Sequence, residues 1–283
     1  MNTSIKKIIS AALREDAAWH DITTQTLIPK NRISQGFIVM KEEGVICGID
    51  IARACFKRLN THVKFQTRYK DGDWVKKNSK VIRIKGRARA LLSAERTALN
   101  FLGFLSGIAT HTNRIVKKIR PFKTKILDTR KTTPTLRILE KYAVHCGGGL
   151  NHRLDLSESI LIKDNHKAVF SGNSKSLFRM VNECKKKSRK PIEVEVESIQ
   201  ELKDVLKARP DFVLLDNVTP REVKEAVQFV KKSKLKPKPL LEASGGITLK
   251  NVRDFAATGV DRISSGALTH THQSINFSME LVS

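Results

Sequence analysis

The chain has 283 residues, of which 53 are Lys or Arg and 28 are Asp or Glu, and its formal net charge is +25. Hydrophobic residues make up 40% of the chain and charged residues 29%, a balance typical of a globular protein with a buried core. This composition excludes a disordered chain, a collagen-like fibre and a disulfide-stapled miniprotein. No apolar stretch approaches the roughly 18 residues of a membrane span, so we expect no membrane association.

The four cysteines, Cys47, Cys55, Cys146 and Cys184, are far apart in the sequence and show no CxxC spacing. Such spacing is typical of reduced thiols in a cytosolic protein. Because free cysteines are usually buried and behave as small hydrophobic residues, we expect each of the four to be buried. The predicted location is cytoplasmic.

The N-terminal third of the sequence predicts a small α+β unit. Apolar residues between Ile5 and Leu13 follow helical spacing, with residues 2–4 as caps. Short strand-like pieces separated by turn signals then fill residues 33–84. Ser93 is expected to cap a long helix that ends near residue 119. Its small residues Gly103, Gly107 and Ala109 indicate close packing against another helix or another subunit.

A different pattern begins after Pro121. Apolar runs of four to six residues alternate with helical segments: TKILDT, SILIKD, IEVEVE, FVLLDN, LLEASG and DRISSG. Continuous apolar strands separated by helices indicate a parallel sheet that is covered on both faces. This many units in succession favour a closed or nearly closed β/α barrel.

Polar residues follow every one of these predicted strands. They are Asp128 to Lys131, Lys163 to His166, Glu195, Asp216-Asn217, Ser244 to Gly246 and Ser264 to Gly266. Because the carboxyl ends of barrel strands meet at one mouth, we expect these side chains to face a shared cavity. The Lys-rich runs at residues 185–190 and 231–239 precede strands instead, so we interpret them as solvated surface at the opposite end.

The predicted mouth is rich in positive charge. Arg130, Lys131, Arg153 and Lys163 would lie there with His152 beside them, and Glu195 and Asp216 would supply the acids. Clustered cations raise the energy of an empty site and are suited to a ligand with several negative charges. The alternative is a set of ordinary salt bridges with acids such as Asp128 and Asp164.

Two glycine-containing loops, Ser244-Gly245-Gly246 and Ser265-Gly266-Ala267, follow the last two predicted strands. Glycines there allow backbone N–H groups to approach a phosphate, although tight turns also use them. The carboxylates of Glu195 and Asp216 could bind Mg²⁺, accept hydrogen bonds from ribose or stabilise a developing positive charge. Of the three acids in this strand we expect Glu195 to point inward, with Glu193 and Glu197 on the other face.

At these residues the chain resembles the quinolinate phosphoribosyltransferase family. The matching segments span essentially the whole chain and include LREDAAWHDITT, AERTALNFLGFLSGIAT, DTRKTTP, GGGLNHR, LIKDNH, IEVEVES and LEASGGIT. The resemblance implies an α/β fold, with an N-terminal α+β sandwich domain over 1–105 and an irregular, roughly seven-stranded β/α barrel over 106–269. The C-terminal tail, 270–283, is a candidate to complete the first domain.

The family's reaction would be the transfer of phosphoribosyl from phosphoribosyl pyrophosphate to quinolinate, giving nicotinate mononucleotide, pyrophosphate and CO₂ with Mg²⁺. The resemblance implies that Thr129, Arg130, Lys131, His152, Arg153 and Lys163 bind the anionic groups, that Glu195 and Asp216 serve ribose and Mg²⁺, and that Ser244, Gly245, Gly246, Ser265, Gly266 and Ala267 hold the 5′-phosphate. Lys131, Lys163, Glu195 and Asp216 would be catalytic. Arg96 would reach the site of a second subunit in a homodimer, or in a hexamer built from such dimers.

The sequence departs from the family pattern at a few positions. His20, Thr135 and Asp155 stand where the family often has Gly, and Asn113 stands where it often has Arg. Two other functions stay open: a related barrel protein associated with molybdate transport genes, and a basic barrel that binds nucleic acid. The intact DTRKTTP and NHR motifs favour the first assignment, and the acids in the predicted groove argue against specific nucleic-acid binding.

Overall fold

The computed structural model describes residues 3–170 and 176–282, and the chain divides into two compact units. The N-terminal unit contains Met1–Asn113, Thr132–Gly148 and Leu268–Ser283, and the barrel unit contains Arg114–Lys131 and Gly149–Ala267. The chain therefore passes between the units several times, whereas the sequence predicts a division near residue 105. The segment 132–148 joins the N-terminal unit because its helix packs there, through contacts that are distant in sequence.

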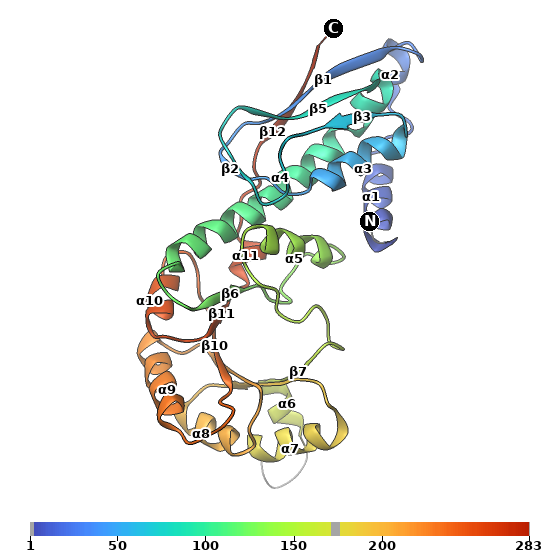
Figure 1. Cartoon of the computed structure of the whole chain (residues 1–283). Coiled ribbons are helices and arrows are strands. Elements are labelled where there is room, and N and C mark those ends of the chain that lie inside the picture. Colours follow the sequence, from blue (N-terminus) through green and yellow to red (C-terminus); the bar gives the residue numbers. More distant parts are fainter. Residues whose placement is uncertain (1–2, 171–175, 283) are drawn as a thin grey trace. The chain divides into compact units, whose positions relative to one another are not determined.

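The N-terminal unit is an antiparallel sheet with helices on one face (Figure 1). Its sheet has the order β12-β1-β5-β3, and β2 pairs with β4 in a small second sheet. The elements are α1 (Thr3–Glu15), α2 (Ile22–Leu27), β1 (Ile33–Met40), β2 (Gly44–Val45), α3 (Ile49–Leu59), β3 (Lys64–Gln66), β4 (Trp74–Val75), β5 (Ser79–Arg87), α5 (Arg137–Cys146), α11 (Ala267–His270) and β12 (Phe277–Val282). The last strand of the chain thus pairs with the first, from Met40↔Phe277 to Gln35↔Val282.

The long helix α4 (Ala88–Ile119) begins six residues earlier than the predicted start at Ala94. Ser93 is not its cap, because the chain is already helical there, and the hydroxyl of Ser93 donates instead to Asp21 Oδ2 at 2.9 Å. The small residues of α4 do allow a close approach, but at Gly103 and Gly107 the approaching segment is not another helix. A Cβ on Gly103 would lie 2.6 Å from the carbonyl oxygen of Ile275, and one on Gly107 would lie 2.3 Å from that of Gln273. The returning C-terminal segment fills this space.

The barrel unit contains all six strands that the apolar runs predict. Its parallel sheet has the order β6-β11-β10-β9-β8-β7. The strands are β6 (Lys125–Leu127), β7 (Ile160–Ile162), β8 (Ile192–Val196), β9 (Phe212–Asp216), β10 (Leu240–Ser244) and β11 (Arg262–Ser264). Leu150 adds one parallel bridge beside Leu127 at the β6 edge. Among the described residues there are therefore six strands and a bridge, where the sequence predicts about seven strands.

Helices follow the strands around the outside of the curved sheet (Figure 1). They are α6 (Asp164–Val169), α7 (Leu177–Lys187), α8 (Ile199–Lys207), α9 (Pro220–Lys232) and α10 (Val252–Ala257). Their starts are encoded locally. Ser198 accepts a hydrogen bond from the N–H of Glu201, and Thr219 forms a reciprocal capping box with Glu222, which satisfies N–H groups that have no partner within the helix.

Both Lys-rich runs precede strands, as predicted: 185–190 covers the end of α7 and the residues that lead to β8, and 231–239 covers the end of α9 and the residues that lead to β10. None of the helices formed by the described residues has both the length and the apolar character needed to cross a bilayer.

Candidate active site

The carboxyl ends of the barrel strands bring the predicted catalytic residues together. Lys163 directly follows β7, Glu195 lies near the end of β8 and Asp216 ends β9. Lys163 Nζ lies 2.8 Å from Glu195 Oε2, and the Glu195 side chain is almost fully buried. The charges of Lys163 and Lys131 both act on Asp216. Lys131, Lys163, Glu195 and Asp216 thus form one electrostatic cluster.

The surroundings of Asp216 disfavour the charged form of its carboxyl. Burial raises the pKa of its carboxyl, and the negative charge of Glu195 raises it further, while Lys163 and Lys131 oppose the shift. Asn217 donates from Nδ2 to Asp216 Oδ2 at 2.7 Å and fixes the carboxylate orientation. Two like charges near one another are stabilised when a cation or a positively charged reacting group arrives.

The segments after β6 and Leu150 supply the arginines. Burial lowers the pKa of Arg153, and the positive charge of Arg130 lowers it further, so the two guanidinium groups repel each other across a short distance. Arg153 Nη1 donates to the carbonyl oxygen of Ser159 at 2.8 Å. The N–H of Lys131 donates to Thr129 Oγ1 at 3.0 Å, which shapes the turn after β6. This pair of arginines is suited to planar anions.

A buried ionic network lies inside the barrel unit, and sequence reasoning missed most of it. His152 Nε2 lies 2.9 Å from Glu193 Oε2 and 3.5 Å from Glu242 Oε1, and Arg262 Nη2 lies 2.7 Å from Glu242 Oε2. Glu193 and Glu242 are both buried. Burial raises the pKa of Glu242, and the charge of Glu193 raises it further. The sequence does contain one indication of this network: Glu242 lies in the middle of the apolar strand LLEAS, and a buried charge needs a partner.

The expectation that Glu193 lies on the outer strand face is wrong. Side chains two positions apart in a strand share a face, so Glu193 points inward with Glu195, and both are at most 5% exposed. His152 is also more deeply placed than predicted. Its side chain is 8% exposed. The imidazole Nδ1 accepts a hydrogen bond from the backbone N–H of Arg153 at 2.8 Å, and the backbone N–H of His152 donates to Asp128 Oδ1 at 2.8 Å. The imidazole therefore positions Arg153.

The two predicted phosphate loops differ in what they expose. Gly245 has φ +97°, and a Cβ there would lie 2.2 Å from Asn217 Oδ1; Gly246 has φ +59° and open space around it. The hydroxyl of Ser265 donates a hydrogen bond to the carbonyl oxygen of Ile247, and the backbone N–H of Ser265 donates to the carbonyl oxygen of Leu127. Ser265 is therefore engaged in holding the loop, and Gly246 presents the accessible backbone. Ser244, Gly266 and Ala267 lie beside them at the ends of β10 and β11.

Arg96 lies elsewhere. It is an exposed residue of α4 in the N-terminal unit, where it lines an open pocket with Glu15, Asp16 and Asn100.

The fold and this site define the class of protein: a β/α-barrel protein with basic and acidic side chains gathered at the carboxyl ends of its strands, which is where barrel enzymes carry out their chemistry. The family Quinolinate phosphoribosyl transferase, N-terminal domain, matches residues 21–106, and its C-terminal domain matches residues 108–280. The chain belongs to the quinolinate phosphoribosyltransferase family.

Individual relatives agree over the full length. The probable nicotinate-nucleotide pyrophosphorylase [carboxylating] of Methanocaldococcus jannaschii is 41% identical over 280 residues, covering 98% of this chain and 96% of that protein. The nicotinate-nucleotide pyrophosphorylase [carboxylating] of Mycobacterium leprae is 40% identical over 276 residues, covering 96% and 95%. The solved structure of the nicotinate-nucleotide pyrophosphorylase from Francisella tularensis superposes with a TM-score of 0.92 at 38% identity, covering 100% of this chain and 97% of that one.

Proposed function

We propose that the protein transfers the phosphoribosyl group of phosphoribosyl pyrophosphate to the ring nitrogen of quinolinate, with loss of CO₂, in de novo NAD biosynthesis. Its products are nicotinate mononucleotide, pyrophosphate and CO₂. The observation that carries the proposal is the charge arrangement after the barrel strands: Arg130 and Arg153 repel each other, and Lys131 and Lys163 act on the carboxylates of Glu195 and Asp216. Both substrates are multiply anionic, and they relieve this repulsion.

Arg130 and Arg153 bind the two adjacent carboxylates of quinolinate, since a guanidinium fork fits a carboxylate in a bidentate manner. His152 keeps the backbone of Arg153 in place through the hydrogen bond at its Nδ1. Lys131 and Lys163 are compact charges suited to the pyrophosphate and to the nearer carboxylate. The loops at Gly245 and Gly266 hold the 5′-phosphate, with Gly246 offering exposed backbone.

When the bond between C1 of the ribose and the pyrophosphate oxygen breaks, its electron pair leaves with pyrophosphate and positive charge develops at C1. Glu195 and Asp216 stabilise that charge, and Lys131 and Lys163 stabilise the leaving group. The ring nitrogen attacks C1 and becomes a pyridinium. The pyridinium then stabilises the electron pair that stays on C2 as the 2-carboxylate leaves as CO₂, and C2 takes up a proton. The residues act by positioning and charge, without a covalent intermediate.

We further propose that Mg²⁺ takes part. Glu195 and Asp216 are two hard carboxylates, and burial, followed by the negative charge of Glu195, raises the pKa of Asp216. Such oxygen ligands suit Mg²⁺ together with substrate phosphates. When bound, Mg²⁺ would neutralise charge on the pyrophosphate.

We also propose a homodimer, alone or as the unit of a hexamer, in which Arg96 reaches the partner subunit's site, and a cytoplasmic location. The exposure of Arg96 on α4 supports a role outside its own unit.

The test is to incubate the purified protein with phosphoribosyl pyrophosphate, Mg²⁺ and quinolinate labelled at its 2-carboxylate, and to follow labelled CO₂ and nicotinate mononucleotide. We expect both products in equal amounts. Parallel reactions contain nicotinate in place of quinolinate. Turnover with nicotinate but not with quinolinate would contradict the proposal, because no CO₂ is then released. Omitting Mg²⁺ and adding a chelator tests the metal separately.

A further inference from the structure

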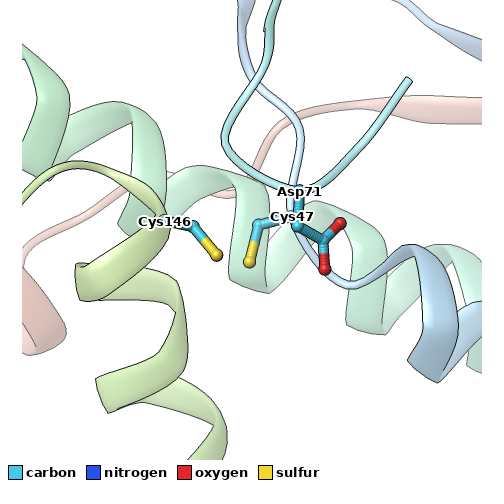
Figure 2. A group of neighbouring side chains, drawn as sticks. All are labelled: Cys47, Asp71 and Cys146. Atoms are coloured by element: carbon cyan, nitrogen blue, oxygen red, sulfur yellow. The ribbon is translucent and has the colours of Figure 1, made fainter.

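Two cysteines that are far apart in the sequence meet inside the N-terminal unit. Cys47 lies between β2 and α3, and Cys146 is the last residue of α5. Their Sγ atoms and a carboxylate oxygen of Asp71 all lie within 4.8 Å of one another, and the two sulfurs are adjacent in Figure 2. The expectation that all four cysteines are buried is wrong for Cys146 and Cys184, which are half-buried. Spacing along the chain gives no sign of this pair.

Helix α4 fixes both cysteines. The N–H of Cys47 donates to Ser106 Oγ at 2.9 Å, and the Ser106 hydroxyl also lies 3.3 Å from the carbonyl oxygen of Cys47. On the other side, Gly147 follows Cys146 and packs so tightly on α4 that a Cβ there would lie 2.4 Å from the carbonyl oxygen of Ala109. The sulfurs are therefore held near each other by packing on one helix.

The two thiols differ in accessibility and acidity. Cys47 is fully buried, and burial raises the pKa of its thiol. Cys146 is half-buried, and a hydrogen bond from Cys47 lowers the pKa of its thiol, assisted by the hydroxyl of Tyr142 and opposed by burial. Of the two thiols, Cys146 is thus the one that is partly exposed and more easily deprotonated, and the thiolate is the nucleophile in disulfide exchange. Cys47 is the buried thiol beside it.

A metal ion fits this cluster less well. Asp71 Oδ1 accepts from the N–H of Ile49 at 3.1 Å, and Oδ2 accepts from the Tyr142 hydroxyl at 2.7 Å. Both oxygens are already hydrogen-bonded, and a structural zinc site uses four ligands rather than the three gathered here among the described residues.

We propose that Cys47 and Cys146 form a reversible disulfide that responds to low-molecular-weight disulfides such as oxidised glutathione. The Cys146 thiolate attacks one sulfur of the small disulfide, forming a mixed disulfide and releasing one small thiolate. Cys47 then loses its proton and attacks Cys146 Sγ, which releases the second small thiolate. Two protein thiols are oxidised and one small disulfide is reduced to two thiols. Side-chain rotation must bring the sulfurs to about 2.05 Å.

The bond would restrain α5, which lies in the sequence between Lys131 and His152, and so between the two segments that carry the site's arginines. This consequence rests on the proposed function. Closing the bond draws the end of α5 toward residues 46–48, and the adjoining GGGLNHR segment must adjust. We therefore expect the oxidised protein to turn over about fivefold more slowly than the reduced protein.

The first experiment identifies the bond. The protein is equilibrated anaerobically in buffers that differ in their ratio of oxidised to reduced glutathione. Free thiols are then alkylated, the protein is digested, and the peptides are identified by mass spectrometry. We expect a Cys47–Cys146 cross-linked peptide that disappears with dithiothreitol. Cys47→Ser should accumulate glutathione at Cys146 instead, and Cys184→Ser is the matched control that should cross-link like the wild type. A mixed disulfide that persists equally in wild type and Cys47→Ser would overturn the proposal. So would zinc retained at one ion per chain with both thiols unreactive.

The second experiment measures turnover of the reduced, oxidised and re-reduced samples. The wild type should lose and regain activity, while Cys146→Ser should not respond to oxidation. Unchanged turnover in fully cross-linked protein would overturn the link to α5. Inactivity of the reduced protein toward quinolinate would contradict the proposed function alone, and the peptide mapping would still decide whether the thiol pair forms its bond.

Discussion

The position of Lys163 depends on the strand that precedes it in the sequence, and its ion pair depends on a neighbouring strand that is distant in the sequence. It follows β7, and its ammonium group meets Glu195 on the neighbouring strand at 2.8 Å. The two side chains form an ion pair, and in the proposed function the lysine would bind anionic groups of the substrates. The contact depends on strand order, because β7 and β8 are neighbours in the parallel sheet.

Replacing Lys163 with Ala should lower kcat by about 100-fold or more, because a preorganised charge that stabilises the transition state is lost. The unfolding midpoint in urea should also fall, because the Glu195 side chain is only 6% exposed and loses the cation that pairs with it. Lys167→Ala is the matched control: Lys167 lies four residues on and pairs with Glu201 at 3.2 Å, away from the proposed substrates. Near-normal turnover in Lys163→Ala would remove this lysine from the mechanism.

Asp216 should lower the stability of the folded protein at neutral pH and raise its activity. A carboxyl whose pKa is raised in the folded state binds protons more readily there than in the unfolded chain, so stability falls as pH rises from the unfolded pKa of about 3.9 through the folded value. The substitution Asp216→Asn removes this pH-dependent loss of stability, because an amide carries no charge. Its Tm should exceed that of the wild type at neutral pH, with a difference that shrinks on acidification, while kcat falls. Asp211→Asn, at the other end of β9, should show neither effect. A lower Tm for Asp216→Asn at pH 7 would be inconsistent with this account.

The backbone at Thr135 gives a structural reason for the glycine that the family resemblance leads us to expect there. The φ of Thr135 is +68°, a conformation that glycine adopts readily and that is strained for a β-branched residue. Thr135→Gly should therefore raise the free energy of unfolding by about 1 kcal/mol, measured by urea denaturation. Thr133→Gly, two residues earlier, should lower it because only chain entropy changes there. If both substitutions destabilise equally, the strain at Thr135 is absent.

At the scale of elements, the two glycines in the loop after β10 have different roles. Gly245 is required by packing, since a Cβ would collide with Asn217, whereas Gly246 has open space. Gly245→Ala should cost about 1–3 kcal/mol of stability through overpacking. Gly246→Ala should cost less and mainly raise the KM for phosphoribosyl pyrophosphate, because its methyl group would occupy the proposed phosphate position. Urea unfolding and separate KM values for the two substrates distinguish them. A larger stability loss in Gly246→Ala would reverse the assignment.

Much of the element structure is predictable from local patterns. The six apolar runs each become a strand, and both Lys-rich runs precede strands. The start of α4 is less predictable, because Ser93 looks like a cap although the helical conformation already begins at Ala88. The segment that packs on Gly103 and Gly107 is not predictable from the sequence either. Small residues indicate that something packs closely, but they do not identify the segment from 273 to 275 that does so.

At the scale of the whole molecule, the proposed dimer can be tested by complementation. Arg96→Ala and Lys163→Ala should each be inactive alone, because each removes a group from every site. Mixed dimers made by co-refolding or subunit exchange should regain about a quarter of wild-type activity, since one of the two sites in each hybrid is intact and half of the dimers are hybrids. Dimer formation is checked by light scattering. Inactive, well-mixed hybrids would argue that Arg96 does not serve a partner's site.

The order of elements along the chain, the residue types at the strand ends and the family motifs were determined by the sequence alone, because strand periodicity and turn chemistry act over a few residues. Tertiary structure decided which distant groups meet: β12 with β1, His152 and Arg262 with the buried acids, and Cys47 with Cys146. Those contacts depend on sheet order and on packing against α4. No local pattern encodes them, since each joins segments that only the folded chain brings together.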